Sequence, residues 1–427
     1  MSTAANDATA LAHEGHERAL DVLRACVCEH GFLASPAERA NYRRIWGRDG
    51  CIMSLAALLS GEGELVDACR QTLRTLARYQ GPHGEIPSNV DPTADRVSYG
   101  GTTGRVDAGL WFAIAAVELW RQSGDDDFLE EMLEPLERYR ALLGAWEFNA
   151  RGLLYVPPTG DWADEYVQSG YVLYDQLLYL QVQRGMGAVH GARHGGADHA
   201  LDERIARLTH LLQANYWFEP GEDGEASTEA PADAYHEVLY HKGREAAEHV
   251  HGTYWLPFFS PHGYGTRFDG MANVLVSLLG VADDARERAV DAYVDELIDD
   301  DVLLLPAFDP VITPRDEYWD DLQMSFSYTF KNQPHEYHNG GLWPLITGLY
   351  AASLARRDLP ERARAFRDAV HRANRRGRAG EAWSFSEYLH GRSHEPGGTS
   401  PMGWSAAAAV IADAYVDGGR LFGEAVG

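Results

Sequence analysis

Helical periodicity of the apolar residues is the feature that most constrains the fold, because it runs through almost the whole chain and strand-like alternation is scarce. Turn signals separate the periodic segments: 61–63 and 123–125 are rich in glycine and acidic residues, and Pro360 opens another segment at its first turn. The pattern predicts twelve helices, near residues 9–30, 50–59, 63–79, 106–122, 126–143, 172–186, 201–214, 270–279, 284–297, 339–355, 360–376 and 402–418.

Twelve helices make six hairpins, and the lengths of their connections alternate. Connections from odd- to even-numbered helices tend to be long, and most of those from even to odd are short, with 187–200 as an exception. This alternation predicts an all-α fold, an (α/α)6 toroid (barrel) whose inner helices receive long loops at one face. A solenoid of tandem repeats also pairs helices, but the chain has no fixed sequence period. No segment resembles an interdomain linker, so residues 1–427 are expected to form a single domain.

Six unusual stretches, rich in aromatic, charged and glycine residues, precede the even-numbered helices. In a toroid these stretches would lie together at one end of the barrel, where loops build a binding site. The stretches are 42–49, 98–107, 160–166, 251–258, 335–344 and 383–391.

The stretch 160–166 places three carboxylates around a tryptophan, in the order Gly-Asp-Trp-Ala-Asp-Glu-Tyr. An aromatic face stacks on a sugar ring, and a carboxyl group with a raised pKa protonates a glycosidic oxygen. Neighbouring carboxylates and aromatic burial are expected to raise the pKa of Asp164, which makes it the candidate general acid. Asp161 is the alternative acid, and capping of the sixth helix is a structural role that either residue could fill.

A second carboxylate is needed to activate water on the opposite face of the sugar, and Glu387 is the candidate general base. It lies between Phe385 and Tyr388, which argues against a solvated loop glutamate. Only a closed fold brings it near Asp164. Inversion at the sugar carbon would need the two carboxyl groups roughly 6.5–9.5 Å apart.

Four of these pieces resemble motifs of the inverting glycosidases on (α/α)6 barrels, and most closely the neutral/alkaline invertases, glycoside hydrolase family one hundred. Residues 106–111 (Val-Asp-Ala-Gly-Leu-Trp), 337–344 (Tyr-His-Asn-Gly-Gly-Leu-Trp-Pro) and 386–391 (Ser-Glu-Tyr-Leu-His-Gly) are similar to stretches of that family. Residues 46–49 (Trp-Gly-Arg-Asp) resemble a motif shared with trehalases and debranching enzymes. The resemblance implies an inverting exo-glycosidase acting on a short α-glucoside, with sucrose or a related disaccharide as substrate.

The acid motif departs from the invertase pattern. Residues 162–164 (Trp-Ala-Asp) look more like the acids of debranching enzymes and disaccharide phosphorylases. A disaccharide phosphorylase, a debranching-type amylo-α-1,6-glucosidase, a sugar epimerase or isomerase on the same barrel, and a non-catalytic sugar-binding protein therefore remain as alternatives.

The resemblance also implies a set of substrate-binding residues. Arg48 and Asp49 would bind sugar hydroxyls, with Trp46 as a stacking wall, or would form a buried ion pair. Asp107 would bind sugar or cap the fourth helix, and Asn339 would bind it or start the tenth helix. The full set is Trp46, Arg48, Asp49, Tyr99, Arg105, Asp107, Trp162, Trp255, His338, Asn339, Gly340, Trp343 and Tyr388.

Charge and composition limit the classes of molecule that the protein is expected to bind. A net charge of −27 disfavours nucleic acid and anionic membranes, and no run of about 18 apolar residues predicts a membrane span. The eighteen histidines show no paired ligand spacing, so neither a metal nor another cofactor is expected. No signal peptide or CxxC pair is visible, which favours the cytoplasm. The partner is a small sugar, and a homo-oligomer stays open. Only Lys242 and Lys331 are lysines, which fits a halophilic source or an ordinary acidic enzyme.

Overall fold

The fold is seen in a computed structural model of the chain. The structure describes residues 3–39, 41–196, 198–219, 230–250, 252–299, 301–325, 328–377 and 381–423. Residue 251, the first of the stretch 251–258, lies outside this part of the chain.

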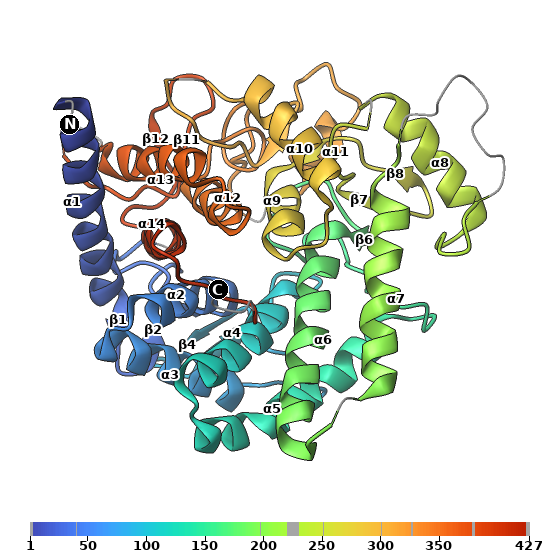
Figure 1. Cartoon of the computed structure of the whole chain (residues 1–427), viewed down its shortest axis with the longest axis horizontal. Helices are drawn as coiled ribbons and strands as arrows, with labels where there is room; N and C mark the ends of the chain where they lie inside the picture. The colour runs from blue at the N-terminus through green and yellow to red at the C-terminus, as the bar shows by residue number, and fades with distance from the viewer. Residues whose placement is uncertain are drawn as a thin grey trace.

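Six helices form an inner ring in which each contacts the next and the last returns to the first (Figure 1). They are buried on nearly all sides, which is why their sequences are apolar all round. In ring order they are α2 (Gly47–Ser60), α4 (Asp107–Ser123), α6 (Leu173–His194), α9 (Gly270–Leu278), α12 (Pro344–Arg356) and α14 (Gly403–Val416).

Six further helices surround this ring and alternate with it along the chain. They bury one face against the inner helices and expose the other, the amphipathic pattern that the sequence showed most clearly. They are α1 (Thr3–Cys26), α3 (Gly63–Arg78), α5 (Asp126–Trp146), α7 (His199–Tyr216), α10 (Asp284–Leu297) and α13 (Pro360–Arg375). The predicted all-α (α/α)6 toroid is confirmed.

Two helices were not predicted, and both lie in long loops: α8 (Glu237–Glu248) and α11 (Trp319–Met324). Helix α8 fully buries only Gly243 and Ala247, but Leu239, Tyr240 and Ala246 also pack against the core at helical spacing, so its apolar face was present in the sequence and was overlooked. The predicted start of the tenth helix at 339 was wrong. That helix, α12, begins at Pro344, because Gly340 has left-handed backbone with φ +87° and Trp343 is extended, so the chain between 339 and 343 is not helical.

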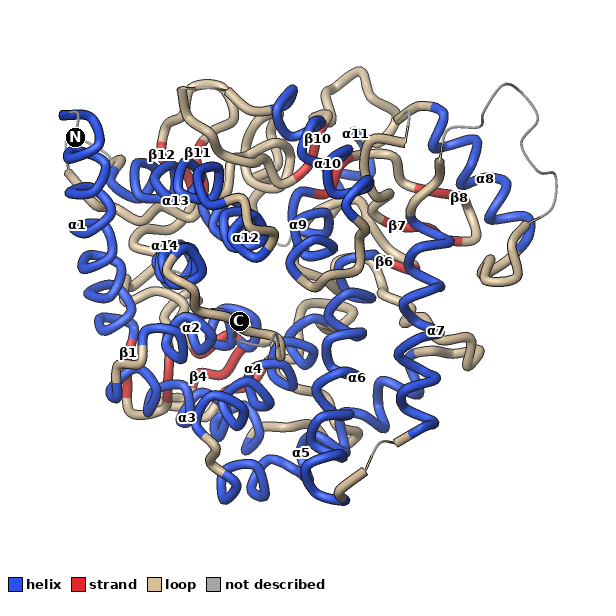
Figure 2. The backbone as a smooth tube through the Cα atoms, in the orientation of Figure 1, coloured by secondary structure: helices blue, strands red, loops and turns tan. Residues whose placement is uncertain are grey.

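Short strands brace the loops that lead into the inner helices (Figure 2). All pairings among them are antiparallel. The strands are β1 (Val27–Cys28), β2 (Gly31–Phe32), β3 (Ile45–Trp46), β4 (Asn89–Asp91), β5 (Arg96–Ser98), β6 (Tyr171–Val172), β7 (Phe258–Ser260), β8 (Gly263–Tyr264), β9 (Phe268–Asp269), β10 (Phe308–Asp309), β11 (Tyr388–Leu389) and β12 (Pro396–Gly397).

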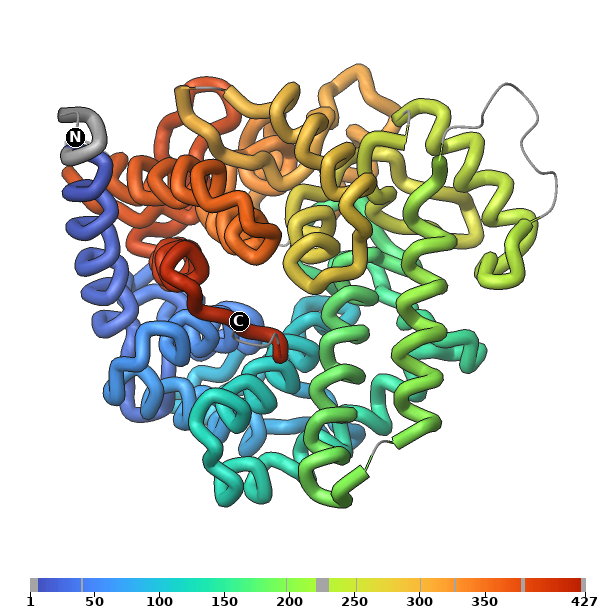
Figure 3. Tube along the Cα trace, viewed as in Figure 1, coloured from blue at the N-terminus to red at the C-terminus, as the bar shows by residue number. Residues whose placement is uncertain are grey.

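The two ends of the barrel differ. The six unusual stretches precede the N-termini of the inner helices, whereas the segment after α14 crosses the ring at the opposite end (Figure 3). There Gln122 and Gln181 donate hydrogen bonds to the carbonyls of Arg420 and Phe422, and Leu421 is buried. Helices from both ends of the chain close one ring. That residues 1–427 form a single domain stays a prediction. No described helix is both long enough and apolar enough to cross a membrane.

Candidate active site

Asp164 is the most accessible carboxylate of the stretch 160–166, with a side chain 17% exposed. Its Oδ2 accepts a hydrogen bond of 2.6 Å from Nη2 of Arg105, which ends the loop before α4. Burial favours a raised pKa, but the cations Arg105 and Arg48 outweigh it, and the pKa of Asp164 is lowered. The expectation of a raised pKa for this group was wrong, because its nearest charged partner is an arginine and not a carboxylate.

Asp161 lies deeper in the same loop and is 1% exposed. Its carboxylate accepts a hydrogen bond from Gln168. Burial, followed by the charges of Asp107 and Asp269, raises the pKa of Asp161 to about 8. Neither Asp161 nor Asp164 caps α6, whose N-cap is Val172 without a side-chain hydrogen bond. Asp161 is therefore the carboxyl that holds a proton near neutral pH, whereas Asp164 is the more accessible of the two.

Glu387 is 2% exposed, so it is not a solvated loop glutamate. Tyr42 donates a hydrogen bond of 2.9 Å to its Oε1, and the main-chain N–H of Thr399 donates one of 2.9 Å to its Oε2. Burial raises the pKa of Glu387, and the Thr399 N–H and Lys331 oppose that rise. The charge of Asp164 adds to that rise. The loops that carry the two carboxyls are linked by Lys331, which lies 3.4 Å from Glu165 and 4.8 Å from the ring of Tyr337, and Tyr337 lies 5.9 Å from Tyr388.

Arg48 and Asp107 form a buried ion pair, with Nη1 of Arg48 2.8 Å from Oδ2 of Asp107. Tyr174 also donates to Asp107, over 3.1 Å. Asp49 lies 3.9 Å from Nε of Arg48, so the ion pair expected within the Arg-Asp motif is made chiefly to another helix. Asp107 is the first residue of α4, and Val106 is the N-cap, so the capping alternative for Asp107 was wrong.

Aromatic rings pack against one another beside the carboxylates and form an aromatic wall in which Trp162, His338 and Trp343 are at most 1% exposed. Trp343 stacks on His338 with ring centroids 5.5 Å apart and on Tyr388 at 5.8 Å. Trp162 meets the edge of His338 at 5.1 Å. Burial lowers the pKa of His338 to about 3, although Asp164 opposes that shift, so the imidazole is neutral at neutral pH. Trp404, from the start of α14, lies over the guanidinium of Arg48 at 5.7 Å.

Trp46, in β3, and Tyr99, in the loop after β5, are both partly exposed, and their role in binding substrate stays a prediction. Trp46 is partly exposed, and its Nε1 donates 2.9 Å to the carbonyl of Asn41. The hydroxyl of Tyr99 donates 2.9 Å to the carbonyl of Tyr79. These hydrogen bonds hold both rings in place. Contact between the faces of the rings and a sugar is left to experiment.

Three predicted ligands have structural roles. Trp255 is fully buried between Trp217 and the α10 residue Arg286, away from the wall of Trp343. The side chain of Asn339 forms hydrogen bonds with the main chains of residues 312 and 332. It therefore does not start a helix, and its polar atoms are already occupied by the protein. Gly340 has φ +87° and a Cβ there would collide with Val311, so its close approach is to the protein itself.

Sequence reasoning missed Tyr42 and Lys331. Tyr42 stands in the stretch 42–49 but was not assigned a role, although it contacts Glu387. The ammonium of Lys331 lies 4.8 Å from the ring of Tyr337 and 3.4 Å from the carboxylate of Glu165. Its position outside the six stretches hid it, and its rarity as one of two lysines was the available signal.

Over the described ranges, no three His, Cys, Asp or Glu side chains converge in a way that could hold a metal ion. The loops that precede the inner helices thus bring together carboxylates, guanidinium groups and aromatic rings. Such a set of groups suits acid–base chemistry on a hydroxyl-rich ligand.

Comparison with known proteins identifies the family. The model of the mannosylglycerate hydrolase MGH1-like glycoside hydrolase domain matches residues 66–405. The chain belongs to this family. It is a glycoside hydrolase, and the matched range holds the predicted acid and base, together with every predicted substrate-binding residue from Tyr99 to Tyr388.

Individual relatives are more distant. The glucosylglycerate hydrolase of Mycolicibacterium hassiacum is 37% identical over 78 residues, which are 18% of this chain and only 16% of that enzyme. The GH63 mannosylglycerate hydrolase of Thermus thermophilus, solved with Tris and D-glycerate, has a TM-score of 0.62 at 15% identity, over 93% of this chain and 99% of that one. A bacterial glucoamylase solved with acarbose has a TM-score of 0.62 at 14% identity, over 94% of this chain and 55% of that one.

The family match changes two sequence-based expectations. The particular closeness to neutral/alkaline invertases is not supported, and neither is sucrose as the substrate. The broader resemblance to (α/α)6 glycosidases holds, and membership of a glycoside hydrolase family disfavours the phosphorylase, epimerase and sugar-binding alternatives.

Proposed function

We propose that this enzyme hydrolyses, with inversion, a small glycoside in which a hexose is joined to a short aglycone bearing a carboxylate, as in glucosylglycerate or mannosylglycerate. Asp164 is the general acid and Glu387 the general base. The observation that carries the proposal is a chain of contacts between the loops of the two carboxyls. Nζ of Lys331 lies 3.4 Å from Glu165, next to Asp164, and 4.8 Å from the ring of Tyr337, which lies 5.9 Å from the ring of Tyr388, next to Glu387.

Accessibility favours Asp164 over Asp161 as the acid. The acid must come within hydrogen-bond distance of the glycosidic oxygen, about 2.6–3.2 Å. Asp161 holds a proton more readily but is enclosed by Gln168 and its own loop. Asp164 lies beside the aromatic wall, where its charge acts on His338.

Glu387 is suited to hold a water molecule for attack. Both of its oxygens are fixed by donors, and the hydrogen bonds to an ionised carboxylate favour the basic form that activates water. Attack from this side, with protonation from the Asp164 side, places the two groups on opposite faces of the sugar, as inversion requires.

The cations of the pocket favour an anionic aglycone. Three positive charges act on Asp164, in a chain whose net charge is −27. A guanidinium binds a carboxylate through two parallel hydrogen bonds, which a neutral sugar aglycone cannot match. The names of the relatives, a glucosylglycerate hydrolase and a mannosylglycerate hydrolase, point to the same class of aglycone.

A hydrolysis screen tests the proposal. Purified enzyme is assayed on glucosylglycerate, mannosylglycerate, sucrose, trehalose, maltose and isomaltose, with Asp164→Asn and Glu387→Gln as controls. We expect kcat/KM for one of the glycerate glycosides to exceed that for every neutral disaccharide by at least about tenfold. The first-formed anomer, followed by NMR, should be the inverted one. Preferential cleavage of a neutral disaccharide would contradict the assigned aglycone.

A further inference from the structure

We propose that Arg105 makes the enzyme selective for a carboxylate-bearing aglycone, by exchanging its ion pair with Asp164 for one with the substrate. The inference rests on the proposed function. It adds the residue, Arg105, and the step by which a negatively charged aglycone increases the turnover rate. Selectivity then comes from protonation of the general acid as well as from the affinity for the substrate.

The side chain of Arg105 is built for such an exchange. It is 8% exposed, its Nη1 donates to the carbonyl of Thr159, and its Nη2 donates to Asp164 over 2.6 Å. Its Nε finds no hydrogen-bond partner among the described residues. Nε and Nη2 form one edge of the guanidinium, so a ligand carboxylate can bind that edge with two hydrogen bonds once Asp164 yields Nη2.

The exchange changes the charge around Asp164. In the free enzyme Arg105 pairs directly with Asp164 over 2.6 Å, and the charges of Arg48, Lys331 and Glu387 also act on Asp164, while His338 is neutral. A bound carboxylate takes Arg105 away from Asp164 and adds a negative charge beside it. Both effects favour the protonated acid. The proton comes from solvent and passes from Asp164 to the glycosidic oxygen during cleavage.

A neutral aglycone has the opposite outcome. It offers no anion to Arg105, so the ion pair between Arg105 and Asp164 stays closed and the acid stays ionised. Lys331 does not make this exchange, because its ion pair is with Glu165 and not with Asp164, so an anion bound by Lys331 would leave the pair between Arg105 and Asp164 closed. Neutral glycosides would therefore bind the aromatic wall but turn over slowly.

Proton uptake on binding is the direct test. D-glycerate and glycerol are titrated into the enzyme by calorimetry at pH 5, in two buffers of different ionisation enthalpy. We expect D-glycerate to take up about half a proton or more per site and glycerol none. In Asp164→Asn the uptake should vanish while binding persists. Binding of D-glycerate with less than about a tenth of a proton would overturn the exchange alone. Absence of D-glycerate binding would overturn the proposed aglycone as well.

Steady-state kinetics provide a second, independent test of the exchange. Arg105→Met should lower the ratio of kcat/KM for the glycerate glycoside to that for a neutral glycoside of the same sugar by at least about tenfold. Arg267→Met is the matched control, since Arg267 is 15% exposed and pairs with Asp316 on a neighbouring loop, and its ratio should stay at the wild-type value. An unchanged ratio in Arg105→Met would exclude the exchange. Activity retained in Asp164→Asn would instead reject the proposed function.

Discussion

The hydroxyl of Tyr42 donates a 2.9 Å hydrogen bond to Oε1 of Glu387, so the connection between α1 and α2 holds the proposed base of the loop before α14. Neighbouring contacts join the same two segments. Ser35 donates 2.6 Å to the carbonyl of Pro401, and Arg39 donates 2.8 Å to that of Gly398. The first and last parts of the chain therefore position the base together.

Replacing Tyr42 by phenylalanine should weaken and retune the base. The Tyr42 hydrogen bond is one of the causes that lower the pKa of Glu387, so its loss raises that pKa. The active form of the enzyme needs Asp164 protonated and Glu387 ionised. In the free enzyme the pKa of Glu387 is raised and that of Asp164 is lowered, so the higher of the two pKa values belongs to Glu387. Glu387 therefore governs the alkaline limb of kcat/KM. We expect this limb to move up by about one pH unit and kcat to fall about tenfold, since a hydrogen bond to a charged group contributes about 1.5–3 kcal/mol.

Tyr350→Phe is the matched control for that measurement. Tyr350 also donates to a buried carboxylate, with 2.6 Å to Oδ1 of Asp291, but it lies between α12 and α10. This variant should lose stability and keep the wild-type pH profile. A Tyr42→Phe profile that coincides with the wild-type curve would show that Tyr42 does not tune the base.

A methyl group at Gly398 should disable the base while the fold survives. Gly398 has φ +70°, and a Cβ there would collide with Oε2 of Glu387. Gly61 has nearly the same φ, +68°, but a Cβ there meets nothing within 4 Å. Both alanine variants should lose about 1–2 kcal/mol of unfolding free energy from backbone strain. Only Gly398→Ala should lose most of its kcat. Equal activity in the two variants would mean that Glu387 tolerates displacement.

The fold could be predicted from sequence because its signal is local and repeated. Apolar periodicity identified the twelve barrel helices, and alternating loop lengths placed the unusual stretches at one end. Helix α8 was missed although Leu239, Tyr240 and Ala246 pack against the core, because it is an extra helix within the connection between α7 and α9 and not part of the alternating pattern. Trp255 was misplaced because a buried aromatic residue in a loop gives no sign of which neighbour it faces.

The site was predicted less completely, for a physical reason. The carboxylates next to Asp164 in sequence suggested a raised pKa, but the groups that decide it come from other loops. Arg105 and Arg48 lie 59 and 116 positions before Asp164 and act on it only once neighbouring hairpins have packed together, and Lys331 acts on it from a segment without a motif. Sequence shows which residue types are present in a loop, whereas a pKa depends on charges brought together by the whole fold.

The choice between the two aspartates can be tested by amide substitution. Asp161 has a pKa of about 8, so at pH 6 it is protonated and an asparagine resembles it, with an oxygen that still accepts from Gln168. We expect Asp161→Asn to stay within about tenfold of wild-type kcat, and Asp164→Asn to lose about 10²–10⁴-fold. Steady-state assays on the best substrate of the screen distinguish them. The reverse order would assign the acid role to Asp161.

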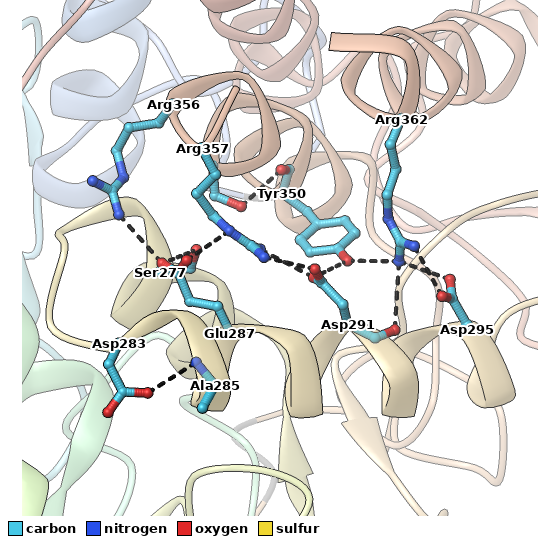
Figure 4. A network of polar contacts seen from close by, with 11 residues as sticks. Ser277, Asp283, Ala285, Glu287, Asp291, Asp295, Tyr350, Arg356, Arg357 and Arg362 are labelled. Carbon is cyan, nitrogen blue, oxygen red and sulfur yellow. Dashed lines mark hydrogen bonds and ion pairs between the residues drawn. The ribbon is translucent and has the colours of Figure 1, made fainter. Parts of the chain in front are cut away.

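A buried ion network joins α10 to α12 and α13 on the outer side of the barrel (Figure 4). Nε of Arg357 lies 2.7 Å from Glu287, and its Nη2 lies 2.7 Å from Asp291. Arg357→Met leaves both buried carboxylates without their main cation. We expect a loss of about 3–5 kcal/mol in unfolding free energy, measured in urea, with kcat unchanged.

The exposed pair of Arg74 and Glu131 is the control for Arg357. Its atoms are 2.8 Å apart, but both side chains are more than two-fifths exposed. Arg74→Met should cost at most about 1 kcal/mol, because solvent screens such a pair. Similar losses in the two variants would show that burial does not make the Arg357 network critical.

The first helix is attached to the barrel by a contact that depends on pH. Nδ1 of His16 in α1 lies 2.9 Å from Asp413 in α14, and Nε2 of His371 in α13 lies 3.0 Å from the same carboxylate. The hydrogen bond to Asp413 raises the pKa of His16, although burial opposes it. Because the folded pKa exceeds the unfolded value of about 6.5, the stabilisation is fully present below pH 6.5 and is lost as pH rises through the folded pKa.

His16→Gln should therefore destabilise the protein in acid and not in alkali. We expect a loss of about 0.5–1 kcal/mol at pH 5.5, a small value because His16 is one-third exposed, and almost none at pH 8.5. Urea unfolding at the two pH values measures the difference. His13→Gln is the control, since His13 lies exposed on the same helix, and it should change neither value. A loss for His16→Gln that is equal at both pH values would show that packing, and not the charge of the imidazolium, attaches α1 to the barrel.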